Sequence, residues 1–111
     1  MPDAALHLDA TFRALSDPRR RAMLDQLAAE GPRTVSEIAA PAGLALPSAV
    51  KHLAQLQEAG LVASDKTGRV RTFRLSATAF ADLESWVAIR RRRVERQLDR
   101  LSQMLTEDGS E

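Results

Sequence analysis

The 111-residue sequence predicts a mainly α-helical domain with one small β-hairpin, in the order four helices, hairpin, last helix. Apolar residues recur at helical spacing over most of the chain, and Gly and Pro cut this pattern into short segments. The spacing changes to that of strands only near residues 61–75. A chain of this length holds one hydrophobic core, so we expect one domain over residues 1–106 and a frayed acidic tail over 107–111.

The first two helices have recognisable end signals. Apolar residues at helical spacing predict a first helix over about residues 4–15. Asp17 followed by Pro18 is typical of a helix N-cap and first helical position, and Gly31-Pro32 ends the second helix at about residue 29. The inner face of this second helix is expected to carry Met23, Leu24 and Leu27.

Two further short helices are joined by a tight turn. Thr34 and Glu37 have the T-x-x-E spacing of a capping box and open the first of them. Gly43 allows the turn, and a second helix follows over about residues 46–59. Two short helices joined in this way are typical of a helix-turn-helix module. In the second helix we expect an inward face of Val50, Leu53 and Leu56.

The remaining segments are a hairpin and one long helix. Residues 61–66 and 70–75 are rich in β-branched or aromatic residues and flank Thr67-Gly68, which predicts a β-hairpin. A hairpin directly after the helix-turn-helix makes a winged helix-turn-helix. The last helix is expected over about residues 77–105. Its seven-residue repeat forms a seam for a partner helix and consists of Phe80, Val87, Val94 and Leu101.

Composition excludes several classes of protein. The chain contains no Cys and no Tyr, no Gly-rich phosphate loop and no G-x-S-x-G motif, so we expect no enzyme. Its two histidines, His7 and His52, form no tight metal-ligand pair, so we expect no metal and no cofactor. No apolar run approaches the ~18 residues of a membrane span. A cytoplasmic protein without membrane contact is therefore expected.

The net charge of +1 conceals two basic segments. Residues 46–74 contain five Lys and Arg against two acidic residues, and residues 90–100 contain six Arg against two. Such segments favour localised contacts with anions. The four arginines at 90–93 point in different directions on a helix, so we expect no single patch from them.

Polar side chains of the helix at 46–59 have the chemistry to contact DNA in a major groove. The hairpin offers arginines to a minor groove or to phosphates. A solvated helix face and a charged sheet edge that blocks aggregation are the alternatives. For His52, a phosphate and a base edge both stay open. The candidate DNA-binding residues are Ser36, Leu46, Pro47, Ser48, Lys51, His52, Gln55, Arg69 and Arg71.

Two stretches resemble a known family. Residues 12–21, Phe-Arg-Ala-Leu-Ser-Asp-Pro-Arg-Arg-Arg, are similar to the opening motif of the ArsR/SmtB-type winged-helix repressors. Residues 46–53 and 58–62 are similar to that family's recognition helix and its exit. The resemblance covers about residues 8–105 and implies a homodimer that binds an operator in double-stranded DNA and represses transcription. The first and last helices would form the interface, with Leu8, Phe12, Phe80, Leu83, Trp86, Val87, Val94, Leu98 and Leu101.

The sequence also departs from the metal-sensing members of this family. Residues 34–42 lack the cysteine pair that some members use, and the last helix has no His. The chain thus resembles a non-metal-sensing branch. A small-molecule effector and regulation by abundance alone both stay open. The alternative function is a winged-helix interaction module without sequence-specific DNA binding.

Overall fold

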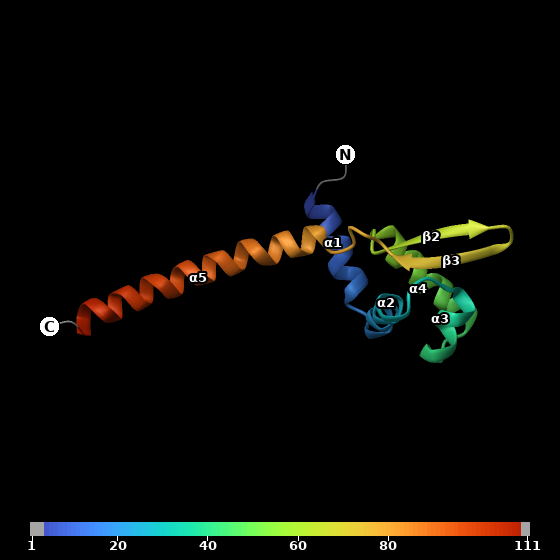
Figure 1. Ribbon diagram of the computed structural model, residues 1–111, viewed down its shortest axis with the longest axis horizontal. Helices are drawn as coiled ribbons and strands as arrows, with labels where there is room; N and C mark the ends of the chain where they lie inside the picture. Colours follow the sequence, from blue (N-terminus) through green and yellow to red (C-terminus); the bar gives the residue numbers. More distant parts are fainter. Residues whose placement is uncertain (1–3, 110–111) are drawn as a thin grey trace. The chain divides into compact units, whose positions relative to one another are not determined.

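The computed structural model describes the backbone of residues 4–109 and the side chains of residues 7–107. The chain divides into two compact units, one up to Phe80 and one from Ala81 (Figure 1). The second unit is α5 (Ala81–Gly109). The first unit contains, in chain order, α1 (Ala4–Leu15), α2 (Pro18–Glu30), β1 (Arg33–Thr34), α3 (Val35–Ala42), α4 (Leu46–Glu58), β2 (Val62–Thr67) and β3 (Val70–Leu75). The predicted winged helix-turn-helix order is confirmed, with β1 as an addition.

The predicted helix starts of α2 and α3 are confirmed by their caps. Asp17 Oδ1 accepts a hydrogen bond from the backbone N–H of Arg19 at 2.8 Å, and Pro18 is the first residue of α2. At α3, Thr34 Oγ1 accepts from the N–H of Glu37 at 3.3 Å, and Glu37 Oε1 accepts from the N–H of Thr34 at 3.0 Å. This is a complete capping box.

The hairpin belongs to a three-stranded antiparallel sheet in the order β1-β3-β2. The predicted hairpin is confirmed, and β1 adds a third strand because its two residues pair with Phe73 and Thr72 of β3. A strand of two residues is too short to show a period in the sequence. The turn consists of Gly68 and Arg69, and Gly68 has the positive φ of 64° that a two-residue hairpin turn requires at its first position.

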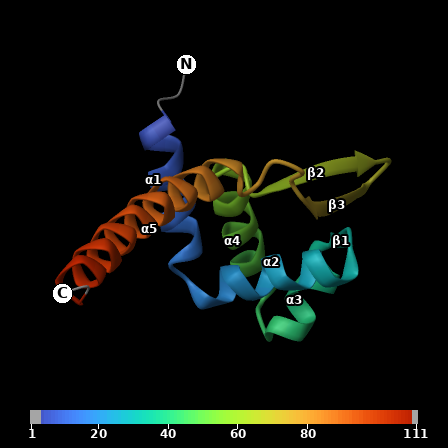
Figure 2. The ribbon, with the colours of Figure 1, turned by 60° about the vertical axis from the view of Figure 1, so that its left-hand side comes forward.

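The core of the first unit lies where α2, α3 and α4 meet the base of the sheet (Figure 2). The predicted inner face of α2 is confirmed. On α4 the prediction for Val50 was wrong, because Val50 is 51% exposed whereas Ala49 is buried with Leu53 and Leu56. At about 100° per residue, positions 49, 53 and 56 form one stripe, and Val50 lies at its edge. Val50 therefore belongs to the exposed face of α4.

The last helix starts later than expected. Residues 77–80 form turns, with Ala79 buried and Phe80 packed against the core of the first unit, so the predicted helix start at 77 was wrong. The helix continues to Gly109, and residues 110–111 of the expected frayed tail lie outside the described residues. Over the described side chains of α5, residues 81–107, none is buried. No helix in the described part of the chain is both long and apolar enough to cross a membrane.

Candidate nucleic-acid interface

The first turn of α4 carries exposed side chains and lacks a side-chain cap. Leu46, Pro47 and Ser48, three of the candidate DNA-binding residues, are all exposed. The N-cap residue is Ala45, which has no side-chain acceptor for the N–H groups of the first turn. Alanine is among the poorest N-cap residues, whereas α2 and α3 are both capped by side chains. The positive end of α4 can therefore accept an external anion.

The middle of α4 presents a polar face with two different edges. Lys51 and Gln55 are four residues apart and both exposed, so they lie side by side at the centre of this face. His52 is half-buried at one edge, next to the core stripe. Val50 lies at the other edge, and its exposed methyl groups suit contact with a thymine methyl group. The sequence prediction missed Val50 because it assigned the residue to the core.

Ser36 lies in the first turn of α3 and is exposed. The neighbouring Glu37 is occupied by the capping box, and the hydrogen bonds from the backbone and side chain of Thr34 hold the pKa of the Glu37 carboxyl below its usual value. Ser36 is thus the polar side chain of this turn that faces outward without a role in the cap.

The wing, defined as β2, β3 and their turn, carries its cations on two faces. Lys66 lies directly opposite Arg71 in the sheet register, and Arg69 is exposed in the turn. Like charges directly opposite each other destabilise a sheet, so a bound anion would relieve this pair. Arg71 Nη1 donates to Ser64 Oγ at 2.7 Å. The sequence prediction named Arg69 and Arg71 but missed Lys66.

Arg74 differs from the other cations of the wing. Its Nε lies 2.9 Å from Asp65 Oδ2, so its charge is offset within the sheet. Arg74 and Asp65 lie on the opposite face from Lys66 and Arg71, because successive side chains in a strand alternate. Among the described residues, Lys66, Arg69 and Arg71 form no ion pair with a carboxylate, and we call them the uncompensated cations of the wing.

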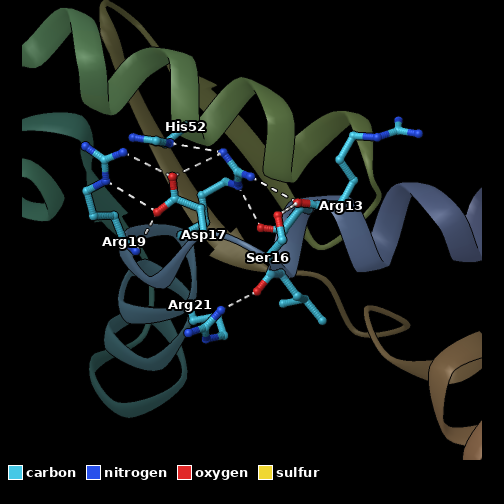
Figure 3. A network of polar contacts seen from close by, with 9 residues as sticks. Arg13, Ser16, Asp17, Arg19, Arg21 and His52 are labelled. Atoms are coloured by element: carbon cyan, nitrogen blue, oxygen red, sulfur yellow. Dashed lines mark hydrogen bonds and ion pairs between the residues drawn. The ribbon is translucent and has the colours of Figure 1, made fainter.

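A network of polar contacts connects the α1–α2 corner with α4 (Figure 3). The Arg20 side chain is buried and reaches His52 of α4, with Nη1 3.4 Å from His52 Nδ1. Asp17 lies 3.2 Å from Arg19 and 3.8 Å from Arg20. The side-chain and backbone hydrogen bonds from Arg19 lower the pKa of Asp17 from 3.8 to about 2. The sequence prediction missed this network, although the Asp-Pro-Arg-Arg-Arg motif contains most of it.

The residues predicted for a dimer interface are mostly exposed. Phe12 of α1 and all the predicted α5 residues except the half-buried Leu83 are exposed, whereas Leu8 and Phe80 are half-buried. The guanidinium of Arg90, from the arginine run, lies 4.3 Å from the centre of the Trp86 ring. Val87, Val94, Leu98 and Leu101 lie on one face of α5 at the spacing of helical turns.

Comparison with known proteins identifies the family. Residues 15–65 match a family model described as a helix-turn-helix domain. The transcriptional repressor SdpR of Bacillus subtilis is 31% identical over 80 residues, which are 72% of this chain and 88% of SdpR. The crystal structure of an ArsR family transcriptional regulator is 41% identical, with a TM-score of 0.76, and the match covers 86% of this chain and 97% of that chain. The chain belongs to the ArsR family of winged-helix transcriptional regulators.

Membership of the ArsR family confirms that the chain is a transcriptional regulator and not an enzyme. A further similar structure is the homodimeric winged helix-turn-helix DNA-binding domain Mb0332 from Mycobacterium bovis. It is 32% identical with a TM-score of 0.65, and the match covers 80% of this chain and 85% of that domain.

A groove lies in the first unit of this ArsR family chain, and the described residues contain no metal-ligand cluster. Among these residues, no three His, Asp or Glu side chains are grouped so that they could hold a metal ion. A groove of about 250 Å³ lies between α1 and α4. It is lined by Ala10, Arg13, Ala14, Gln55, Glu58 and Ala59.

Proposed function

We propose that this ArsR family regulator is a homodimeric repressor that reads an imperfect palindrome in double-stranded DNA. Each copy would place α4 in a major groove and its wing on the neighbouring backbone. Two relatives support this proposal, because SdpR is a transcriptional repressor and the similar Mycobacterium bovis domain is a homodimeric DNA-binding domain. Such a protein acts where its operator lies, in the cytoplasm.

The observation that carries the proposal is the exposed face of α4. A helix that served only the fold would gain stability from a capping side chain at position 45, yet the N-cap of α4 is Ala45, and the helix places apolar Leu46 and Val50 in solvent. Both features suit a helix end that approaches a phosphate and base edges. The reading residues we propose are Ser36, Leu46, Pro47, Ser48, Val50, Lys51, His52 and Gln55.

The wing would supply affinity rather than sequence preference. Contacts to phosphates position a protein on DNA but carry no base information. The uncompensated cations Lys66, Arg69 and Arg71 suit such contacts, and the opposition of Lys66 and Arg71 would be relieved by a phosphate between them.

The exposed apolar stripe of α5 supports dimerisation. Val94 is 50% exposed and Leu98 is 58% exposed in the single chain. A helix without buried residues gains little stability in water from propensity alone, so an apolar stripe of this length needs a partner. We propose a second copy as this partner, with contributions from Leu8, Phe12, Leu83, Trp86, Val87, Val94, Leu98 and Leu101. Phe80 contributes less to this interface, because it packs against the core of its own unit.

The first test is selection of duplexes from a random DNA pool at moderate salt. We expect an enriched palindrome whose half-sites lie about one helical turn, or about 34–36 Å, apart. The variant Lys51→Ala should lose affinity for that duplex, whereas Arg93→Ala removes the same charge from α5 and should bind it like the wild type. No enrichment by a folded, dimeric protein would contradict the proposal and favour the interaction module without DNA binding.

A further inference from the structure

We propose that Arg20 is a positioning residue for DNA recognition, which holds His52 in the tautomer with its proton on Nε2. His52 would then meet DNA as a hydrogen-bond donor and would select an acceptor. This inference rests on the proposed function, since it concerns how α4 contacts DNA.

Arg20 is fixed by contacts with the end of α1. Its Nε–H donates to the carbonyl of Ala14 at 2.6 Å, and its Nη2–H donates to the carbonyl of Arg13 at 3.0 Å. Both carbonyls belong to the last turn of α1, where a helix leaves its C=O groups without partners inside the helix. The Arg20 side chain is 9% exposed. Two hydrogen bonds and burial therefore set where the remaining nitrogen, Nη1, points.

The chemistry of the two side chains decides the position of the proton on His52. Nη1 of Arg20 lies 3.4 Å from Nδ1 of His52, within hydrogen-bond distance. A guanidinium has N–H donors only and cannot accept, so Nδ1 must accept with its lone pair. A neutral imidazole carries one proton, which is then on Nε2. The charge of Arg20 is partly offset by Asp17, whose carboxylate lies 3.8 Å away (Figure 3).

A fixed Nε2–H group restricts what His52 can recognise. In the major groove it matches guanine N7 and O6, adenine N7 and thymine O4, and it opposes the amino groups of cytosine and adenine. A phosphate oxygen is also an acceptor. The sequence alone allows either ring nitrogen to be the donor, whereas the contact with Arg20 assigns this role to Nε2.

Two variants of His52 separate the roles of its nitrogens. The amide of Gln lies near the position of the imidazole Nε2, and the shorter Asn places its amide near Nδ1. His52→Gln should therefore keep a donor towards DNA and bind the selected duplex close to wild-type affinity. His52→Asn should keep an acceptor for Arg20 but bind at least about tenfold more weakly, the loss typical of one good base contact. Equal affinity of both variants would overturn the inference.

The tautomer itself is measured by ¹⁵N NMR of the imidazole rings in the wild-type protein, at an alkaline pH at which the rings are neutral. We expect a protonated Nε2 and an unprotonated Nδ1 for His52. The chain has two histidines, so His7→Gln assigns the signals. A protonated Nδ1 would overturn the inference while the proposed function stands. Failure of the wild type to select any duplex would instead overturn the proposed function, and with it the role of His52 in recognition.

Arg20→Met tests the positioning role directly. It removes every donor, so the His52 signals should move towards a mixture of tautomers, and affinity should fall in proportion to the fraction that keeps Nε2–H, about twofold for an equal mixture. The double variant Arg20→Met with His52→Gln should recover the affinity of His52→Gln, because the Gln donor needs no partner on Nδ1. A folded Arg20→Met protein with an unchanged tautomer would contradict the proposal. If this variant does not fold, the His52 variants and the wild-type spectra still decide the question.

Discussion

The uncompensated cations of the wing are expected to carry a measurable share of the salt dependence of DNA binding. The informative change is Arg71→Gln, which removes a cation that lies opposite Lys66 and has no carboxylate partner among the described residues. Each phosphate that a cation neutralises contributes ~0.9 to the slope of log affinity against log salt. A dimer has two wings, so the slope should become less steep by ~1.8. Between 50 and 200 mM salt, the wild type should thus lose about 12-fold more affinity than the variant.

The matched control is Arg74→Gln, which makes the same substitution three residues along the same strand. The charge of Arg74 is offset by Asp65 at 2.9 Å, and both side chains lie on the other face of the wing. The loss of this exposed ion pair should cost less than about 1 kcal/mol in stability and leave the slope near that of the wild type. Fluorescence anisotropy titrations of a labelled operator over a series of salt concentrations measure both slopes.

Two results would refute this reasoning. A wild-type slope in Arg71→Gln would mean that Arg71 does not neutralise a phosphate in the complex. Equal reductions in Arg71→Gln and Arg74→Gln would mean that the net charge of the wing acts at a distance, without the local contacts that the sheet register suggests.

Four further variants test the dimer, the core and the cap at Asp17. Val94→Asp places a charge in the apolar stripe of α5 and should give monomers that no longer bind the operator. A stable dimer of this variant, measured by light scattering, would contradict the proposed dimer interface along α5. Leu53→Ala should lower the free energy of unfolding by about 2–5 kcal/mol, whereas the exposed Val50→Ala should change it by less than about 0.5 kcal/mol, both measured by urea denaturation at fixed protein concentration. The lowered pKa of Asp17 stabilises the fold above about pH 4, and this contribution is lost as pH falls towards about 2. The variant Asp17→Asn keeps the cap but cannot ionise, so its melting temperature should fall less over that pH range than that of the wild type. Equal falls in the two proteins would show that ionisation of Asp17 does not stabilise the fold.

Local signals in the sequence predict most of the fold. The Asp17 cap and the Thr34–Glu37 capping box depend on residues within one helical turn, so the sequence places these helix starts correctly. The strand β1 escaped prediction because its two residues are ordered by pairing with β3, far along the chain. The start of α5 was placed too early because residues 77–80 continue an apolar helical pattern while Phe80 packs against the core of the first unit.

The candidate site was predictable only in part. Exposure of Lys51 and Gln55 follows from helical spacing. Val50 lies at the edge of the buried stripe of α4, where a small rotation of the helix about its axis determines whether a side chain is buried or exposed. The contact between Arg20 and His52 joins residues 32 positions apart and depends on how α2 packs against α4. An arginine in a basic run is ordinarily exposed, so nothing local in the sequence distinguishes Arg20 from Arg19.

The alternation of core and exposed positions along α4 has a consequence for specificity. Ala49, Leu53 and Leu56 are constrained by the core, whereas Lys51 and Gln55 face outward and can change without loss of packing. A family built on this helix can therefore acquire new operators by exchanging outward residues on a constant core. His52 differs from these residues, because its Nδ1 is joined through Arg20 to the carbonyls at the end of α1. A substitution there alters both the hydrogen bonds of the α1–α2 corner and the surface proposed to meet DNA, so retargeting this regulator should begin with Lys51 and Gln55 and leave His52 in place.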